Sequence, residues 1–211
     1  MNLPNKLTVA RFFLTAGFVG CMTLAWGRPV EEVAFGGVPP TLSWAWGYTA
    51  ALVFFVAASI TDWLDGMLAR KWKLETDFGR LMDPVADKVM VAAAFICLIP
   101  EKAIPAWSVI VVISREFLIT GMRLLAASKG VVLPAERLGK HKATWQMVTV
   151  IFFLVLLALM EWERAGVLHG LYWWAFAWRY VGGALVTLTL VLTLYSGVGY
   201  VLKNRALITE K

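Results

Sequence analysis

Long apolar runs constrain the fold of this chain more than any other feature of its sequence. Two of them, AALVFFVAASIT at 50–61 and VMVAAAFICLI at 89–99, belong to stretches of the length that crosses a lipid bilayer, about 20 residues in a helix. Of the 211 residues, 60% are hydrophobic and 16% are charged, whereas a soluble domain has about a quarter of its residues charged. The sequence therefore predicts an all-α integral membrane protein in which residues 1–211 form a single domain.

Six stretches are predicted as transmembrane helices, at about residues 8–26, 45–70, 79–99, 105–127, 139–161 and 180–202. Before the first of them, Leu3, Leu7 and Val9 are interspersed with Lys6 and Arg11, a pattern typical of a short amphipathic helix on the membrane surface. We therefore expect six spans preceded by a short surface helix.

Lysine and arginine are unevenly divided between the two sides of the membrane that this topology creates. The ends and loops on the side of the N-terminus carry thirteen of them, and the other side carries four, Arg28, Lys102, Arg164 and Arg179. Because positively charged loops stay in the cytoplasm, we expect a protein of the cell (inner, cytoplasmic) membrane with both termini facing the cytoplasm. The net charge of +6 fits loops that face anionic lipids, so nucleic acid is not an expected partner.

Four aspartates recur at regular spacing in DWLDGMLARKWKLETDFGRLMDPVADK, residues 62–88. If both halves of this segment are helical, Asp62 and Asp65 share a face of one helix, and Asp83 and Asp87 share a face of the next. Converging carboxylates repel one another unless cations bind them, and oxygen ligands in this number suit Mg²⁺ or Mn²⁺. The pattern predicts a divalent-metal site at the membrane boundary; solvated charges at helix ends are the alternative.

Other common catalytic arrangements have few residues to draw on in this sequence. His141 and His169 are the two histidines, and Cys21 and Cys97 both lie in apolar runs. The chain has neither a phosphate-binding P-loop nor a dinucleotide-binding glycine motif. These observations disfavour a Ser-His-Asp or Cys-His mechanism and leave the aspartates as the candidate catalytic groups.

The pattern DxxDGxxAR, followed eight residues later by GxxxDxxxD, resembles the signature of the CDP-alcohol phosphotransferase family. The resemblance implies a CDP-linked lipid substrate, CDP-diacylglycerol, whose pyrophosphate is bridged by two divalent cations. It also implies that Asp62, Asp65 and Asp83 are metal ligands. Asp87 would both contact a metal and accept the proton of the acceptor hydroxyl. The opening NLPNKLTVAR is similar to the NxPNxLTxxR pattern of the same family.

The expected CDP-lipid site extends beyond the aspartates. Gly66, Ala69 and Gly79 lack bulk, so a nucleotide can approach the helix backbone there. Arg70 can reach a phosphate oxygen or interact with the C-terminus of its own helix. The residues assigned to the CDP-lipid are Asn5, Thr8, Asp62, Asp65, Gly66, Ala69, Arg70 and Gly79.

A second, basic site is predicted from arginines inside the fourth apolar stretch. Arg115 and Arg123 need an anionic partner there; Glu116 can serve one of them, and a phosphate on the acceptor can serve the rest. SREFLITGMRLLAASKG and LGKHKATWQM are similar to the phosphatidylglycerophosphate synthase branch of the family, whose acceptor is glycerol 3-phosphate. One position departs from that branch, because Ala143 replaces the usual Thr and Thr144 follows it. The residues assigned to the acceptor phosphate are Arg11, Arg115, Arg123, Lys140 and Lys142.

Several alternatives stay open at the level of the sequence. Another acceptor, such as inositol phosphate, serine or phosphatidylglycerol, would use the same aspartates. A cation-coupled transporter would place its acids near the middle of the spans and would contain an inverted repeat. A scaffold without activity would leave the metal ligands without a purpose. Membrane lipids are expected partners of any of these proteins, and the family resemblance implies a homodimer.

Overall fold

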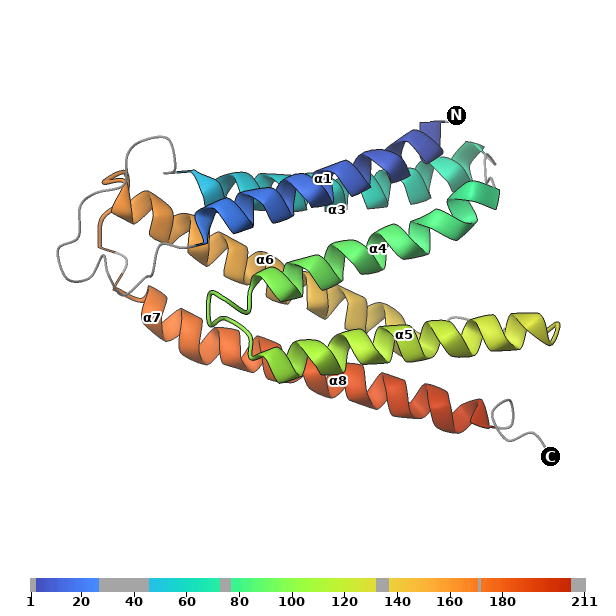
Figure 1. The fold of residues 1–211 in the computed structure, drawn as a ribbon. Helices are drawn as coiled ribbons and strands as arrows, with labels where there is room; N and C mark the ends of the chain where they lie inside the picture. Colours follow the sequence, from blue (N-terminus) through green and yellow to red (C-terminus); the bar gives the residue numbers. More distant parts are fainter. Residues whose placement is uncertain (1–2, 27–45, 73–76, 132–136, 171, 206–211) are drawn as a thin grey trace.

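The computed structural model describes residues 3–26, 46–72, 77–131, 137–170 and 172–205. Throughout these ranges the chain is helical, without a β-strand, as the sequence predicted. Figure 1 shows long helices that lie side by side in an elongated bundle, with the beginning of α1 and the end of α8 at the same end of it.

The helices of the bundle agree with the six predicted stretches to within a few residues. They are α1 (Leu3–Ala25), α3 (Gly47–Trp72), α4 (Asp77–Cys97), α5 (Ala106–Ser128), α6 (Arg137–Arg164), the short α7 (Trp174–Phe176), the π-helical turn η2 (Ala177–Val181) and α8 (Gly182–Lys203). The agreement follows from local chemistry, because apolar length and the Gly- and Pro-containing segments between the runs already determine where a membrane helix begins and ends.

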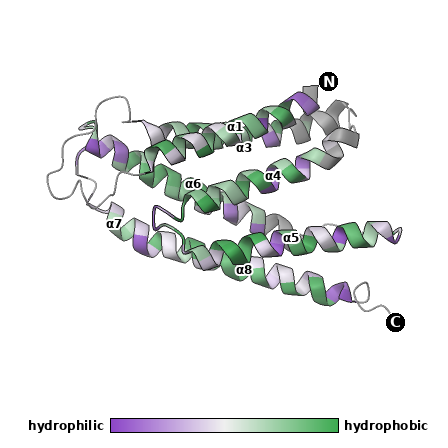
Figure 2. Ribbon diagram, in the orientation of Figure 1, coloured by the Kyte–Doolittle hydropathy of each residue, from purple (hydrophilic) through white to green (hydrophobic). Residues whose placement is uncertain are grey.

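Four helical segments are long and apolar enough to cross a membrane, judged by length and composition. They are Asn5–Ala25, Gly47–Leu64, Lys142–Arg164 and Trp174–Lys203. The helices α4 and α5 are as long as a span but carry charged residues along their length, and Figure 2 shows hydrophilic positions within both. Four spanning candidates are therefore confirmed within the described ranges, and the predicted count of six is not.

The predicted surface helix is not a separate element, because α1 is one continuous helix from Leu3 to Ala25. No glycine or proline interrupts the sequence from Asn5 to Ala16. Thr8 and Arg11 are buried against the bundle. Arg11 therefore faces other helices rather than water, whereas Lys6 is exposed, and an amphipathic surface helix is not confirmed.

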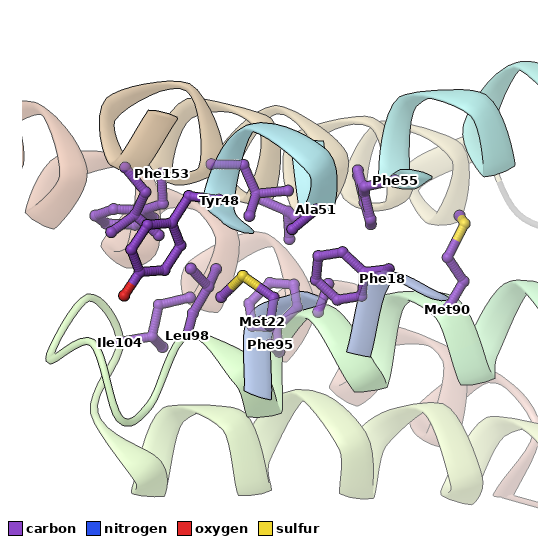
Figure 3. Close-up of a cluster of buried hydrophobic side chains, with 14 of the residues drawn as sticks. Phe18, Met22, Tyr48, Ala51, Phe55, Met90, Phe95, Leu98, Ile104 and Phe153 are labelled. Atoms are coloured by element: carbon purple, nitrogen blue, oxygen red, sulfur yellow. The ribbon is translucent and has the colours of Figure 1, made fainter. Parts of the chain in front are cut away.

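The centre of the bundle is an apolar core between α1, α3, α4 and α6 (Figure 3). Phe18 of α1 and Phe55 of α3 lie with their ring centroids 5.6 Å apart. The two helices approach closely at Gly17, where a Cβ atom would lie 2.9 Å from the ring of Phe54. Met90 of α4 is buried in the same core. This packing fixes α1 against the two helices that carry the aspartates.

The helices α6 and α8 form a second contact, and α5 packs on α8. The two run antiparallel in Figure 1, and the Thr149 and Thr189 hydroxyls are 2.9 Å apart across their interface. At the start of α8, a Cβ atom on Gly182 would lie 2.7 Å from the ring of Phe153, so this position requires glycine. The α6–α8 contact therefore has a defined register, in which Thr149 lies opposite Thr189.

A buried carboxylate from α6 caps the N-terminus of α3. Glu161 accepts hydrogen bonds from the backbone N–H groups of Tyr48 and Thr49, at 3.0 and 2.8 Å, and from the Thr49 hydroxyl at 2.7 Å. The indole N–H of Trp162 donates to the same hydroxyl at 2.8 Å. A negative charge at a helix N-terminus is favourable, so these contacts join α3 to α6 at the end of the bundle remote from the aspartates.

Candidate active site

Three of the predicted aspartates come together where α1, α3 and α4 meet. Asp62 lies on α3, and Asp83 and Asp87 lie one turn apart on α4. Each of them contacts a side chain from the first turns of α1. The structure therefore brings Asp62, Asp83 and Asp87 to one end of the bundle, as their helical spacing predicted.

Arg11 of α1 lies between two of these aspartates. Its Nη1 is 2.8 Å from Oδ1 of Asp62 and 2.8 Å from Oδ1 of Asp87, and its side chain is 0% exposed. The Thr8 hydroxyl, one turn earlier, donates to Oδ1 of Asp83 at 2.6 Å. The first turns of α1 therefore orient the carboxylates of both neighbouring helices.

The shared nitrogen brings two negative charges close together. Because Oδ1 of Asp62 and Oδ1 of Asp87 both contact Nη1 of Arg11, they lie no further apart than twice 2.8 Å. Carboxylates at such a separation repel, and the guanidinium between them offsets that repulsion. A positive charge at this point is thus a requirement of the arrangement, and Arg11 supplies it here.

The donor chemistry of this cluster fits a divalent cation. Carboxylate oxygens are the ligands that Mg²⁺ and Mn²⁺ prefer, and the side chains of Asp62 and Asp87 are 39% and 49% exposed, so an ion can reach them. Among the described residues, no group of three or more His, Cys, Asp or Glu lies close enough together to hold a metal ion. The fourth predicted ligand, Asp65, follows Asp62 on α3, with a side chain outside the described residues.

Two of the other residues assigned to the CDP-lipid, Asn5 and Gly79, lie on the same helices as this cluster. Asn5 is buried on α1, one turn before Thr8, and Gly79 is buried near the start of α4. The predicted contacts at Gly66, Ala69 and Arg70 lie outside the described residues, although their backbone belongs to the last turns of α3.

A second polar cluster joins α5, α6 and α8. Oε1 of Glu116 accepts a hydrogen bond from Nη1 of Arg115 at 3.1 Å and forms an ion pair with Nζ of the buried Lys142. Nη2 of Arg115 donates to the Ser196 hydroxyl on α8 at 3.0 Å. Arg115 and Lys142 are therefore brought together as predicted, and Glu116 is the carboxylate that pairs with both.

The remaining residues assigned to the acceptor phosphate are more widely placed. Arg123 is exposed; its Nε is 3.3 Å from the Tyr200 hydroxyl, and its guanidinium lies over the Tyr200 ring at 5.7 Å. Arg11 lies among the aspartates rather than with Arg115. Lys140 belongs to the first turn of α6, with a side chain outside the described residues.

Lys88 lies between the two clusters and was missed by the sequence reasoning. Its Nζ donates to the Thr120 hydroxyl of α5 at 2.6 Å, and that hydroxyl donates to the backbone carbonyl of Glu116 at 2.7 Å. A lone lysine next to Asp87 inside an apolar run was the signal available in the sequence. Lys88 thus connects α4, next to Asp87, with the part of α5 that carries Glu116.

Comparison with known proteins identifies the family. A family model described as CDP-alcohol phosphatidyltransferase matches residues 1–195. The chain belongs to the CDP-alcohol phosphatidyltransferase family. This membership confirms the resemblance carried by the aspartate pattern at 62–87.

Several members of the CDP-alcohol phosphatidyltransferase family are similar to this chain over most of its length. A protein of Bacillus subtilis is 45% identical over 157 residues, which are 74% of this chain and 77% of that protein. One of Mycoplasma pneumoniae is 34% identical over 82% of this chain and 77% of its own length. One of Shigella flexneri is 34% identical over 97% and 96%. All three are named CDP-diacylglycerol–glycerol-3-phosphate 3-phosphatidyltransferase.

Proposed function

We propose that this chain is a membrane enzyme that transfers the phosphatidyl group of CDP-diacylglycerol to glycerol 3-phosphate and releases CMP. The observation that carries the proposal is its similarity, at up to 45% identity, to proteins named for that reaction. The geometry supports it, because a cluster of aspartates suited to a metal-bound pyrophosphate adjoins a cluster of cations suited to a phosphate.

The aspartates would bind the donor through metal ions. Two divalent cations, Mg²⁺ or Mn²⁺, held by Asp62, Asp65, Asp83 and Asp87, would neutralise the pyrophosphate of CDP-diacylglycerol. Thr8 orients Asp83, and Arg11 orients Asp62 and Asp87. The contacts of Arg11 support a role at the aspartates rather than at the acceptor phosphate to which the sequence assigned it.

In the reaction, Asp87 accepts the proton of the acceptor hydroxyl. The hydroxyl oxygen forms a bond to the phosphorus of the phosphatidyl group, and the bond from that phosphorus to the oxygen of CMP breaks. CMP leaves as a phosphate anion and so needs little help from an acid. A single base is therefore sufficient on the protein side. Asp87 is a partly exposed carboxylate and precedes Lys88, which reaches toward the helix that carries Glu116.

The acceptor would bind through its phosphate to the basic cluster. Arg115 and Lys142 are the central cations; Arg123 lies two turns further along α5, and Lys140 belongs to the first turn of α6. Because Glu116 pairs with Arg115 and Lys142 in this structure, the acceptor phosphate must replace some of its contacts. This cluster favours a phosphorylated acceptor over serine.

The membrane arrangement proposed here has six spans, with α4 and α5 added to the four apolar segments. Both are 21 residues or longer, which suffices to cross a bilayer. Their charged residues are expected to face the site rather than lipid. The inner membrane, cytoplasmic termini, a cytoplasmic active site and a homodimer complete the proposal.

The deciding experiment measures CMP release by the purified protein in liposomes that contain CDP-diacylglycerol. Glycerol 3-phosphate, inositol phosphate, serine and phosphatidylglycerol are offered as acceptors in parallel. We expect release with glycerol 3-phosphate, its loss on chelation, and its return with Mg²⁺ or Mn²⁺. Incorporation of serine but not glycerol 3-phosphate would contradict the acceptor, and full activity under exhaustive chelation would contradict the metals.

A further inference from the structure

The interface between α6 and α8 contains polar groups that are buried but unpaired. Gln146 on α6 and Thr193 on α8 are 3% and 0% exposed, yet Nε2 of Gln146 and Oγ1 of Thr193 find no hydrogen-bond partner among the described residues. Nε of Arg115, on the adjoining α5, is a third such atom. Buried polar groups are almost always hydrogen-bonded, so three unpaired groups in one region call for a common partner.

The register of the two helices places these groups at one level. The hydrogen bond between Thr149 and Thr189 aligns α6 and α8, which run antiparallel. Gln146 lies three residues before Thr149, and Thr193 lies four residues after Thr189, so both fall one turn further along the interface in the same direction. Gln146 and Thr193 are therefore at the same depth in the bundle.

The basic cluster lies one further turn along both helices in the same direction. Lys142 is one turn before Gln146 on α6, and Ser196 is three residues after Thr193 on α8. Ser196 accepts a hydrogen bond from Arg115, and its hydroxyl donates to the backbone carbonyl of Thr193 at 3.2 Å. The unpaired groups thus form the inner side of the cluster that Arg115 and Lys142 begin.

All three unpaired groups can donate a hydrogen bond. The Gln146 amide and the Arg115 guanidinium Nε are donors, and a hydroxyl such as that of Thr193 can donate as well as accept. Donors next to two cations favour a partner that is negative and offers several acceptor oxygens. A phosphate group has this chemistry, whereas a single water molecule lacks the charge.

We propose that Gln146, Thr193 and Nε of Arg115 form the inner wall of the acceptor site and donate hydrogen bonds to the phosphate of the acceptor. The inference rests on the proposed function. It adds Gln146 and Thr193, which were not assigned to the acceptor phosphate from the sequence, to Arg115, which was. In this arrangement Glu116 is the anion that pairs with the cations in the absence of substrate, and phosphate oxygens take up the donors that Glu116 leaves unpaired.

The first test compares two shape-conserving variants with a matched control. Thr193→Val and Gln146→Met each remove one unpaired donor, and Thr189→Val removes a buried hydroxyl one turn away that is already paired with Thr149. We expect the first two to raise KM for glycerol 3-phosphate about tenfold and to leave KM for CDP-diacylglycerol within about twofold. Thr189→Val should change neither KM. Thr193→Ser keeps the hydroxyl, so its KM for glycerol 3-phosphate should equal that of the unchanged protein.

A second measurement does not depend on turnover. The shift in Tm on adding glycerol 3-phosphate, inorganic phosphate or glycerol reports binding to the folded protein. We expect both phosphate compounds to raise Tm of the unchanged protein, glycerol to have no effect, and both shifts to fall in Thr193→Val and Gln146→Met. Because no bond is broken in the free protein, Tm without ligand should stay the same or rise in Thr193→Val.

The outcomes separate this inference from the proposed function. Unchanged acceptor KM and unchanged phosphate-induced Tm shifts in both variants would mean that the groups contact only water, and the inference would be wrong. A shift with glycerol that depends on Thr193 would assign the groups to hydroxyls and also overturn it. If no product forms with glycerol 3-phosphate but the inorganic phosphate shift still depends on Thr193, the proposed function fails while the anion site stands.

Discussion

Arg11 shows how much of the candidate site depends on a single side chain. It is fully buried, contacts Asp62 and Asp87 with one nitrogen, and belongs to a helix that is remote from both in the sequence. Its pattern in the sequence indicated a surface helix and a phosphate ligand. The structure instead assigns it the positive charge that lets two carboxylates approach each other.

Replacing Arg11 by Ala should expose the repulsion between the aspartates. We expect the free energy of unfolding to fall by about 1–3 kcal/mol, since a charged hydrogen bond to partly exposed carboxylates is lost. If Asp62 and Asp87 bind divalent cations, added Mg²⁺ should restore part of that loss. Thermal unfolding in detergent measures both effects, with Lys6→Ala on the exposed side of the same helix as the control. Equal stabilisation of the unchanged protein and Arg11→Ala by Mg²⁺ would argue against metal binding at these residues.

Replacing Asp87 by Asn removes the proposed base but keeps an oxygen that can accept the hydrogen bond of Arg11. We expect kcat to fall at least about 100-fold, the lower range for loss of a general base, while binding of CDP-diacylglycerol is largely kept. CMP release and a binding assay with labelled CDP-diacylglycerol measure the two quantities. Turnover within tenfold of the unchanged protein would remove Asp87 from the role of base.

At the scale of single helices, α3 is held at both of its ends. Near one end, Asp62 pairs with α1; at the other, Glu161 of α6 binds the first backbone N–H groups of the helix. Since α3 is 26 residues long, a shift at either end would move the aspartates relative to α4. The cap at Glu161 is therefore part of what positions a site at the far end of the bundle.

Glu161→Gln tests how much the charge of this cap stabilises the folded protein. The amide keeps one acceptor oxygen but loses the negative charge at the N-terminus of α3, so we expect unfolding to become easier by about 1–2 kcal/mol. Glu163→Gln, two residues further along α6, serves as the control. Urea or thermal unfolding measures the effect on stability. A Tm equal to that of Glu163→Gln would show that the charge contributes little.

At the scale of the whole molecule, the bundle has two distinct ends. The aspartates, the end of α5 and the end of α8 lie at one, and the turn at 98–105 and the Glu161 cap lie at the other. Many large apolar side chains of the described helices are exposed on the outside of the bundle, as expected of helices that contact lipid. This polarity of the molecule supports a site at one face of the membrane.

Cysteine labelling tests the proposed topology. In a chain with Cys21 and Cys97 replaced by Ser, the variants Lys102→Cys, Lys129→Cys and Lys203→Cys each carry one thiol in a turn or helix end. We expect a membrane-impermeant thiol reagent to label the cysteine at 102 in intact cells, and to label those at 129 and 203 only after the membrane is opened. Labelling of 102 and 129 from the same side would contradict a span by α5.

The sequence alone determined the helices, the aspartate pattern and the family, because helix length, apolar runs and residue spacing are local properties of the chain. Tertiary structure decided which polar residues meet. Thr8 contacts Asp83 across 75 positions, Tyr48 contacts Glu161 across 113, and Arg115 reaches Ser196 across 81. Such pairs depend on how helices pack and on their register, and no local pattern of residues encodes either. Of the residues assigned to the acceptor phosphate, Arg115 and Lys142 lie together and Arg11 lies with the aspartates, whereas the helices of the bundle were predicted to within a few residues.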